Sequence, residues 1–278
     1  MLMPTPLHLA DLLPKLDALL IELLEGLSAT DWERQTLAGN WSIKDVAAHL
    51  LDGNLRTLSM LRDGYAGETP GPISSYRELV DFLNQLNADW VKAARRLSPK
   101  IVIELLKRTG EEYCDYLQTL DPDAQAVWPV AWAGESESKN WFHIAREYTE
   151  KWHHQQQIRF ALQDDRELLK PHWYLPYLDT SVSALPYHYR AVEGVKGDVI
   201  RFVFVGEGEK NWFLLFEENW SLYRSMDAKP TCEVRIPDEY AWRMFTKGIS
   251  REEAIRKSQI TGKSALGMKI FDMLAIMG

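Results

Sequence analysis

The pattern of apolar residues changes once along this 278-residue chain, close to residue 165. Up to that point, apolar side chains recur at helical spacing in long runs that are separated by short polar breaks. Beyond it they form short, alternating or fully apolar runs such as DVIRFVFV, NWFLLFEE, WSLYRSM and CEVRI. The sequence therefore predicts an all-α helical bundle over residues 1–164 and a small α+β domain with a mainly antiparallel sheet over residues 165–278.

Polar caps and prolines indicate where the helices begin. Ser42 is followed three residues later by Asp45, an acidic variant of the capping box, and Pro99 suits the first turn of a helix. Pro14 either kinks the first helix or starts its longer half. The helices expected in the first domain cover residues 6–26, 42–62, 75–96, 99–119 and 138–163. In the second domain, helices are expected in PDEYAWRMFTKG, SREEAIRKS and KSALGMKIFDMLAIM.

Composition excludes several classes of partner. The formal net charge is -8, and the 32 Lys and Arg residues are scattered along the chain, so nucleic acid is not an expected partner. No apolar run is long enough to span a membrane. Cys114 and Cys232 lie far apart and form no CxxC pair, which favours neither a disulfide framework nor a cysteine zinc site. We expect a cytoplasmic protein that is either a monomer or a homodimer.

Residues 138–163 contain a dense set of metal-capable side chains. Residues four apart on a helix lie one above the other, so Glu150 and His154 share a face, as do His143 and Glu147. In a helical bundle the remaining ligands come from facing helices, and His49 is the best such contributor. One carboxylate and two imidazoles would leave a position open at a zinc ion, which is the catalytic pattern.

An ordinary structural interpretation competes with the metal site. A single histidine in an apolar helix is commonly a hydrogen-bonded core residue, and a Glu–His pair is commonly solvated. A helical wheel places Trp141, Tyr148 and Trp152 opposite Glu150 and His154, so the simplest expectation is that the polar face is wet. Flanking apolar side chains indicate instead that this helix is covered on more than one side; they are Phe142, Phe160 and Ala161.

Two segments resemble a known family. DWERQTLAGNWSIKDVAAHL resembles the amino-terminal signature of the mycothiol-dependent maleylpyruvate isomerase family, a branch of the DinB-like metal-binding four-helix bundles. EYTEKWHHQQQIR is similar to the other metal motif of that superfamily. Aligned on its Gln-Ile pair, the resemblance implies His49, Glu150 and His154 as metal ligands, with His143 and His153 as bystanders. ALPYHYRAV, GDVIRFVFVG, CEVRIPDEYAWRMFTKGIS and ITGKSALG look like the sterol-carrier-like domain attached to this family's bundle.

The resemblance implies a metal- and thiol-dependent enzyme. In the family, a divalent ion, here expected to be zinc, works with a low-molecular-weight thiol such as mycothiol or an equivalent. The reaction is either cis–trans isomerisation of a maleylpyruvate-like substrate or transfer of the thiol to another electrophile. The metal-bound thiol or water carries the chemistry, so no protein nucleophile is assigned. A small electrophile or dicarboxylate is the expected substrate, and Arg56 and Arg190 are candidates for binding it.

A non-catalytic carrier is the alternative. In that case the second domain would hold an apolar ligand, and the bundle would serve as a scaffold. The segments VIRFVFV and WFLLF are apolar on both faces, which suits either a tunnel lining or an ordinary buried sheet. The buried sheet is the favoured interpretation.

Overall fold

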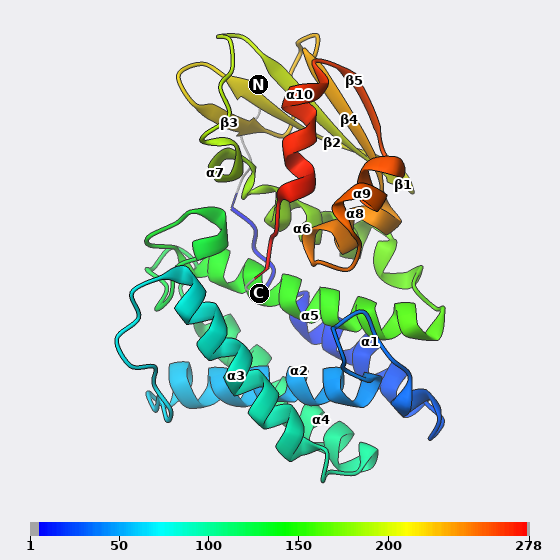
Figure 1. The fold of residues 1–278 in the computed structure, drawn as a ribbon. Coiled ribbons are helices and arrows are strands. Elements are labelled where there is room, and N and C mark those ends of the chain that lie inside the picture. Colours follow the sequence, from blue (N-terminus) through cyan, green and yellow to red (C-terminus); the bar gives the residue numbers. More distant parts are fainter. Residues whose placement is uncertain (1–5, 277–278) are drawn as a thin grey trace. The chain divides into compact units, whose positions relative to one another are not determined.

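The computed structural model describes residues 6–276, which form two compact units (Figure 1). The helical unit consists of residues 8–127 and 150–165, and the sheet unit consists of residues 6–7, 128–149 and 166–276. Each unit is therefore assembled from stretches that are separate in the sequence. A domain boundary after residue 164 stays a prediction.

The long helices of the first part of the chain lie where the sequence predicts them. They are α1 (Leu13–Glu25), α2 (Ile43–Thr57), α3 (Tyr76–Ala94), α4 (Pro99–Thr119) and α5 (Asn140–Leu162). α1 begins at Leu13 rather than at residue 6, and Pro14 stands in its first turn, where a missing N–H costs nothing. Short helical turns also occur at Asp31–Glu33 and, directly after α2, at Leu58–Arg62.

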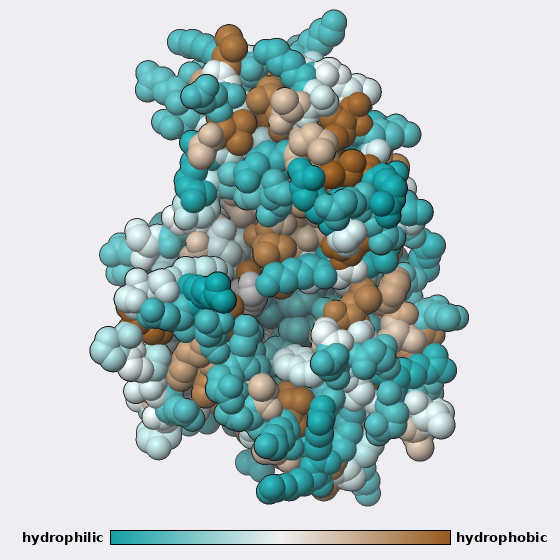
Figure 2. Space-filling view, viewed as in Figure 1, coloured by the Kyte–Doolittle hydropathy of each residue, from teal (hydrophilic) through white to brown (hydrophobic). Residues whose placement is uncertain are grey.

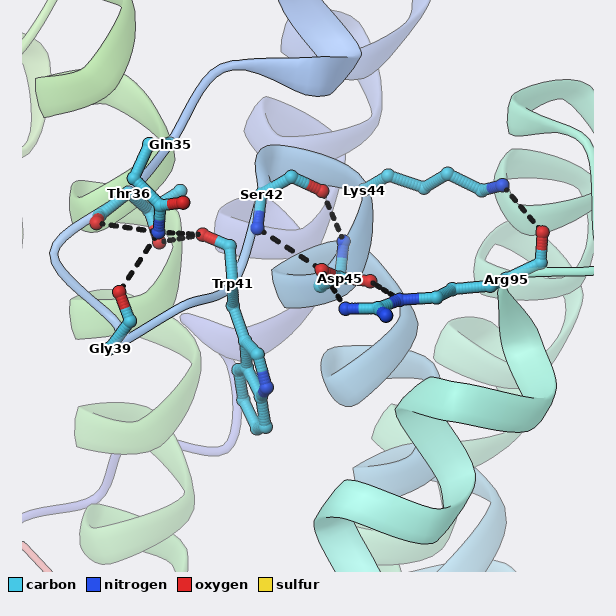
Figure 3. Close-up of polar contacts among 8 residues, drawn as sticks. All are labelled: Gln35, Thr36, Gly39, Trp41, Ser42, Lys44, Asp45 and Arg95. Atoms are coloured by element: carbon cyan, nitrogen blue, oxygen red, sulfur yellow. Dashed lines mark hydrogen bonds and ion pairs between the residues drawn. The ribbon is translucent and has the colours of Figure 1, made fainter.

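The start of α2 is fixed by a network of polar contacts (Figure 3). Ser42 and Asp45 form the expected capping box, in which each side chain accepts a hydrogen bond from the other residue's backbone N–H. Arg95 donates to both carboxylate oxygens of Asp45, at 3.1 and 3.0 Å. The backbone carbonyl of Trp41 accepts hydrogen bonds from the side chains of Gln35 and Thr36. The loop that carries Trp41 is thereby held against the first turn of α2.

The core of the helical unit draws side chains from α1, α2, α4 and α5. Its buried members are Leu20, Leu24, Trp32, Ile43, Val46, Ala47, Leu50, Leu51, Val102, Leu106 and Ile158. α3 packs on α2, where the indole N–H of Trp90 donates to the Ala48 carbonyl at 2.8 Å. The predicted helical fold of the first part of the chain is confirmed.

The sheet unit contains a five-stranded mixed sheet within the described residues. Its strands are β1 (Val199–Gly206), β2 (Gly208–Phe216), β3 (Trp220–Tyr223), β4 (Cys232–Pro237) and β5 (Gln259–Gly262), in the order β3-β2-β1-β4-β5. β1 runs parallel to β4, and every other pairing is antiparallel. Phe202 on β1 shows the register, since it pairs with Trp212 on β2 and Val234 on β4. The predicted α+β fold with a mainly antiparallel sheet is confirmed.

Short helices complete the sheet unit. They are α6 (Pro171–Val182), α7 (Leu185–Tyr189), α8 (Asp238–Phe245), α9 (Arg251–Arg256) and α10 (Ser264–Gly267). α8 and α9 were expected, whereas the expected final helix is short and continues as a 3-10 turn over Met268–Asp272. Hydrophilic side chains cover much of the surface visible in Figure 2. Among the described residues, no helix combines the length and the apolar character needed to cross a bilayer.

Candidate metal centre

The second half of α5 is polar and yet buried. The side chains of His153, Gln155, Gln156 and Gln157 are buried, and His154 is only 7% exposed. The expectation of a wet polar face is therefore wrong for His154, although 32% of the Glu150 side chain is exposed, and α5 is covered on more than one side. Buried polar groups are unfavourable unless they have partners. The contacts of these side chains therefore indicate what this stretch of helix is for.

Glu150, His153 and His154 form a candidate metal site. Their ligand atoms all lie within 4.8 Å of one another, and no other group of three metal-capable side chains meets this criterion within residues 6–276. The Glu150 carboxylate lies 3.6 Å from His154 Nε2 and 4.0 Å from His153 Nδ1. One carboxylate and imidazole nitrogens are a ligand set suited to zinc and similar divalent ions.

The orientation of His154 is fixed by Gln157. His154 Nδ1 lies 2.9 Å from the Gln157 amide oxygen, one turn further along α5. An amide oxygen only accepts, so Nδ1 carries a hydrogen and donates it to Gln157, and Nε2 is the ring nitrogen that faces Glu150. A ring nitrogen that is held in this way by its opposite nitrogen is the usual arrangement of a metal-binding histidine.

His49 on α2 lies against the same group. Its ring is edge-on to that of His154, with centroids 4.6 Å apart, and Trp41 packs on it at 5.0 Å. Its Nδ1 is buried, and no described residue gives it a hydrogen bond. An unpaired buried nitrogen is costly unless something outside the chain binds it. His49 does not belong to the tight group of three, so its role as a ligand stays a prediction.

Electrostatics keep two of these side chains, His49 and Glu150, in the forms that bind metals. Burial lowers the pKa of His49 well below its usual value, and the neighbouring His154 lowers it further. Burial alone would raise the pKa of Glu150, but the hydrogen bond and charge of His154, together with His153 and His49, lower it to about 2. His49 is therefore neutral and Glu150 is ionised at neutral pH, as metal ligation requires.

Of the two candidate substrate-binding arginines, only Arg56 belongs to the helical unit. It pairs with Asp52 at 3.0 Å and donates to the Asn87 amide oxygen on α3 at 3.0 Å. Its positive charge is close enough to lower the pKa of His49. Arg190 belongs to the sheet unit, where it is exposed and stacks on the Tyr187 ring at 3.7 Å.

The other metal-capable pair on α5 is structural. His143 Nδ1 accepts a hydrogen bond from Arg146 at 2.7 Å, and Arg146 also donates to Glu147 at 3.0 Å. The Arg146 guanidinium thus already bridges His143 and Glu147, whose Nδ1 and carboxylate oxygen lie 3.9 Å apart. Burial and this neighbouring guanidinium lower the pKa of His143 to about 4, although Glu147 opposes the change.

The cysteines are not activated. Cys114 and Cys232 are both buried. Burial, aided by the charge of Asp17, raises the pKa of Cys114 to about 12, and burial raises that of Cys232 to about 11. Neither thiol is ionised near neutral pH, so neither is a nucleophile.

Sequence reasoning missed the part played by two residues. Gln157 served only to align the motif, although its spacing of three from His154 predicts contact on a helix. The family resemblance implies that His153 is a bystander, yet its ring centroid is 3.9 Å from that of His154 and it belongs to the cluster.

Comparison with known proteins identifies the helical part of the chain. A crystal structure of the mycothiol-dependent maleylpyruvate isomerase is 10% identical, with a TM-score of 0.49, over 88% of this chain and 91% of the other. Sterol carrier protein 2 like 2 from Aedes aegypti is 16% identical, with a TM-score of 0.29, over 35% of this chain and 95% of the other.

Sterol carrier protein 2 from Yarrowia lipolytica is 10% identical, with a TM-score of 0.25, over 28% of this chain and 66% of the other. No curated protein sequence matches the chain. The sequence of residues 13–159, more than half of the chain, matches the model of one domain family. The chain therefore belongs to the mycothiol maleylpyruvate isomerase N-terminal domain family.

Proposed function

We propose that this protein is an enzyme that binds a divalent metal ion, with zinc as the expected ion, through His49, Glu150 and His154. The observation that carries the proposal is the buried, unpartnered Nδ1 of His49 beside the Glu150–His154 pair. An ion that bound there would give this nitrogen the partner that the chain does not supply. His153 is the alternative ligand that the same cluster offers.

The proposed cosubstrate is a low-molecular-weight thiol. A bound divalent ion would supply Lewis acidity, which makes a thiolate available near neutral pH. The thiol has to come from outside the chain, because burial keeps Cys114 and Cys232 protonated. Mycothiol or an equivalent thiol, used in cis–trans isomerisation or in transfer to an electrophile, fits the family to which the chain belongs.

The chain's own residues would bind and orient the reactants. Gln157 holds the His154 ring, and the capped loop before α2 holds Trp41 against His49. Arg56 is the proposed residue for an anionic substrate, because its guanidinium group is partly exposed and its partner Asp52 has a pKa raised by burial. A substrate carboxylate would replace Asp52 as the partner of this guanidinium. Arg190 is proposed as a second anion-binding residue.

The test is the metal content of untagged protein, measured by plasma mass spectrometry. Near-stoichiometric zinc, nickel or manganese is expected in wild type and is expected to be lost in His49→Ala and Glu150→Ala. His143→Ala is the matched control, since it removes a buried histidine that lies outside the cluster. A metal-free wild type that cannot be loaded, or full occupancy in either folded variant, would contradict the three-ligand site.

Activity is then assayed with maleylpyruvate and other small electrophiles, with and without added mycothiol, bacillithiol or glutathione. Turnover that depends on both the thiol and the metal supports the proposal, and turnover without any thiol contradicts it. The carrier alternative predicts a different outcome. Native mass spectrometry would then find a bound lipid in protein that holds no metal.

A further inference from the structure

A second buried polar cluster lies in the helical unit and joins α1, α2, α4 and α5. Lys151, only 6% exposed, donates to both carboxylate oxygens of Asp17 at 2.9 and 3.0 Å and to the Asn54 amide oxygen at 2.8 Å. Its ammonium group also lies over the Tyr113 ring, 4.4 Å from the centroid. Burying an ammonium group is very unfavourable unless it is paired in this way. These contacts tie α5 to three other helices at one point.

Residues of α4 pack closely around this polar cluster. The Asn54 side chain, 1% exposed, donates to the Thr109 hydroxyl on α4 at 3.2 Å, and that hydroxyl donates to the Leu105 carbonyl at 2.7 Å. Gly110 on α4 faces the cluster, where a Cβ atom would come within 2.9 Å of an Asp17 carboxylate oxygen. Glycine is unfavourable inside a helix. Its presence here is explained by the room that the Asp17 carboxylate needs.

The two helices that this cluster joins also carry the candidate metal ligands. Asn54 follows His49 on α2, and Lys151 follows Glu150 directly on α5. A slip of one helical turn displaces a side chain by about 5.4 Å, whereas metal–ligand distances must hold to about 0.2 Å. The site therefore needs one fixed register between α2 and α5. Apolar contacts alone specify register weakly, while a buried polar pair specifies it well.

We infer that Asp17, Lys151 and Asn54 are positioning residues, which fix α2 against α5 and so hold His49 at the separation from Glu150 and His154 that a shared ion requires. The inference rests on the proposed metal site. It assigns a purpose to Lys151, a buried lysine outside the candidate ligand set. Without the Lys151–Asn54 hydrogen bond, the helices stay packed through their apolar faces, but the ligands are no longer held at one spacing.

The test compares Asn54→Leu with Thr109→Val. Asn54→Leu removes the link between α2 and α5 and leaves the Lys151–Asp17 pair intact. Thr109→Val leaves that link intact and removes only the hydroxyl partner of Asn54, so it controls for lost stability. We expect the zinc Kd, measured by competition with a chromophoric chelator, to rise on the order of 10-fold in Asn54→Leu alone. The visible spectrum of the cobalt-loaded protein should change in the same variant.

A second measurement needs no metal. His49→Cys and His154→Cys together place one thiol on each helix. The rate at which oxidised glutathione converts these two thiols to a disulfide, with release of two reduced glutathione molecules and in the presence of a chelator, reports the spacing of α2 and α5. Adding Asn54→Leu should slow this rate severalfold, and adding Thr109→Val should not. Equal effects of the two changes on both the zinc Kd and the oxidation rate would overturn the inference.

The two proposals can fail separately. If wild type binds no zinc, the proposed function is wrong, and the oxidation rate alone decides whether the cluster fixes the register. If Asn54→Leu does not fold, the variant Asp17→Leu/Asn54→Leu/Lys151→Met takes its place, because apolar replacement of an entire buried ionic cluster is often tolerated. That variant should be as stable as wild type and still lose zinc affinity. Unchanged affinity in it would overturn the inference.

Discussion

His49 and His154 stand edge to face, with ring centroids 4.6 Å apart, although one belongs to α2 and the other to α5. The Glu150 carboxylate approaches His154 Nε2 to 3.6 Å on the same side. Two imidazoles and a carboxylate thus converge within the helical unit, and the Nδ1 atom of His49 is left without a partner among the described residues.

Replacing the two adjacent histidines should have different effects. Successive residues on a helix point about 100° apart, and His154 contacts both Glu150 and His49. We expect His154→Ala to abolish metal binding and His153→Ala to retain it, measured by plasma mass spectrometry on the purified proteins. The reverse result would make Glu150 and His153 the ligands and would exclude the set implied by the family motif.

Gln157 should affect metal affinity without touching the ion. Gln157→Leu removes the acceptor of His154 Nδ1, so the ring is free to turn and to change tautomer. We expect metal affinity to fall by about 10- to 100-fold, the range typical of such supporting residues. Gln157→Glu keeps an oxygen acceptor and should restore most of the affinity. Equal losses in the two variants would show that the effect comes from packing rather than from the hydrogen bond.

His143 should make the protein less stable in acid. Its pKa in the folded state is about 4 against 6.5 for a free histidine, so between these values the unfolded chain binds more protons than the folded one. Stability therefore rises with pH through this window and is lost as the pH falls from about 6.5 to 4, by up to about 3 kcal/mol.

His143→Gln keeps an acceptor for Arg146 but does not titrate. Urea unfolding at several pH values should show a shallower loss of stability in this variant than in wild type. Parallel pH profiles for the two proteins would contradict a neutral, buried His143.

Replacing the buried Asp45 should lower the free energy of unfolding more than replacing an exposed acidic residue. It completes the capping box with Ser42 and accepts two hydrogen bonds from Arg95 (Figure 3). We expect Asp45→Ala to lower the free energy of unfolding by about 1–2 kcal/mol. Asp81→Ala is the control, because Asp81 forms only an exposed ion pair with Arg77 and should change stability very little. Urea denaturation measures both.

The native protein should resist alkylation of its thiols. Burial raises the pKa of Cys114 to about 12 and that of Cys232 to about 11, so little thiolate is present at pH 8. We expect iodoacetamide to leave both residues unmodified until the protein is denatured, as read by mass spectrometry. Rapid labelling of either cysteine in the folded protein would reopen the question of a protein nucleophile.

Sequence reasoning succeeded where local chemistry decides the structure. The starts of α2 and α4 follow from Ser42 and Pro99, whose caps act within one turn. α6 was not predicted: Pro171 suits its opening turn, but Pro176 lies in its interior, where proline disfavours a helix. β5 was not predicted either, since its four residues are mostly exposed and carry no apolar pattern.

In the candidate site, too, the sequence predicts local spacing but not the packing of distant helices. Residue types and spacing indicate that Glu150 and His154 share a face, and the structure brings them together. The helical wheel fails for this stretch of α5 because it assumes one covered face, whereas this helix is covered on more than one. The contact of His49 with His154 depends on how two distant helices pack, which periodicity alone does not specify.

The interleaving of the two units along the chain limits how the protein can be cut. A fragment that ends at residue 127 would keep α1 to α4 but would lack Glu150, His153 and His154 altogether. A fragment of residues 1–164 would regain them, but it would expose residues 128–149, which pack in the sheet unit, and would lose the hydrogen bond from Tyr148 to the Trp173 carbonyl. A fragment that keeps the three side chains of the candidate metal site must therefore also carry residues of the sheet unit, because α5 contributes to both units.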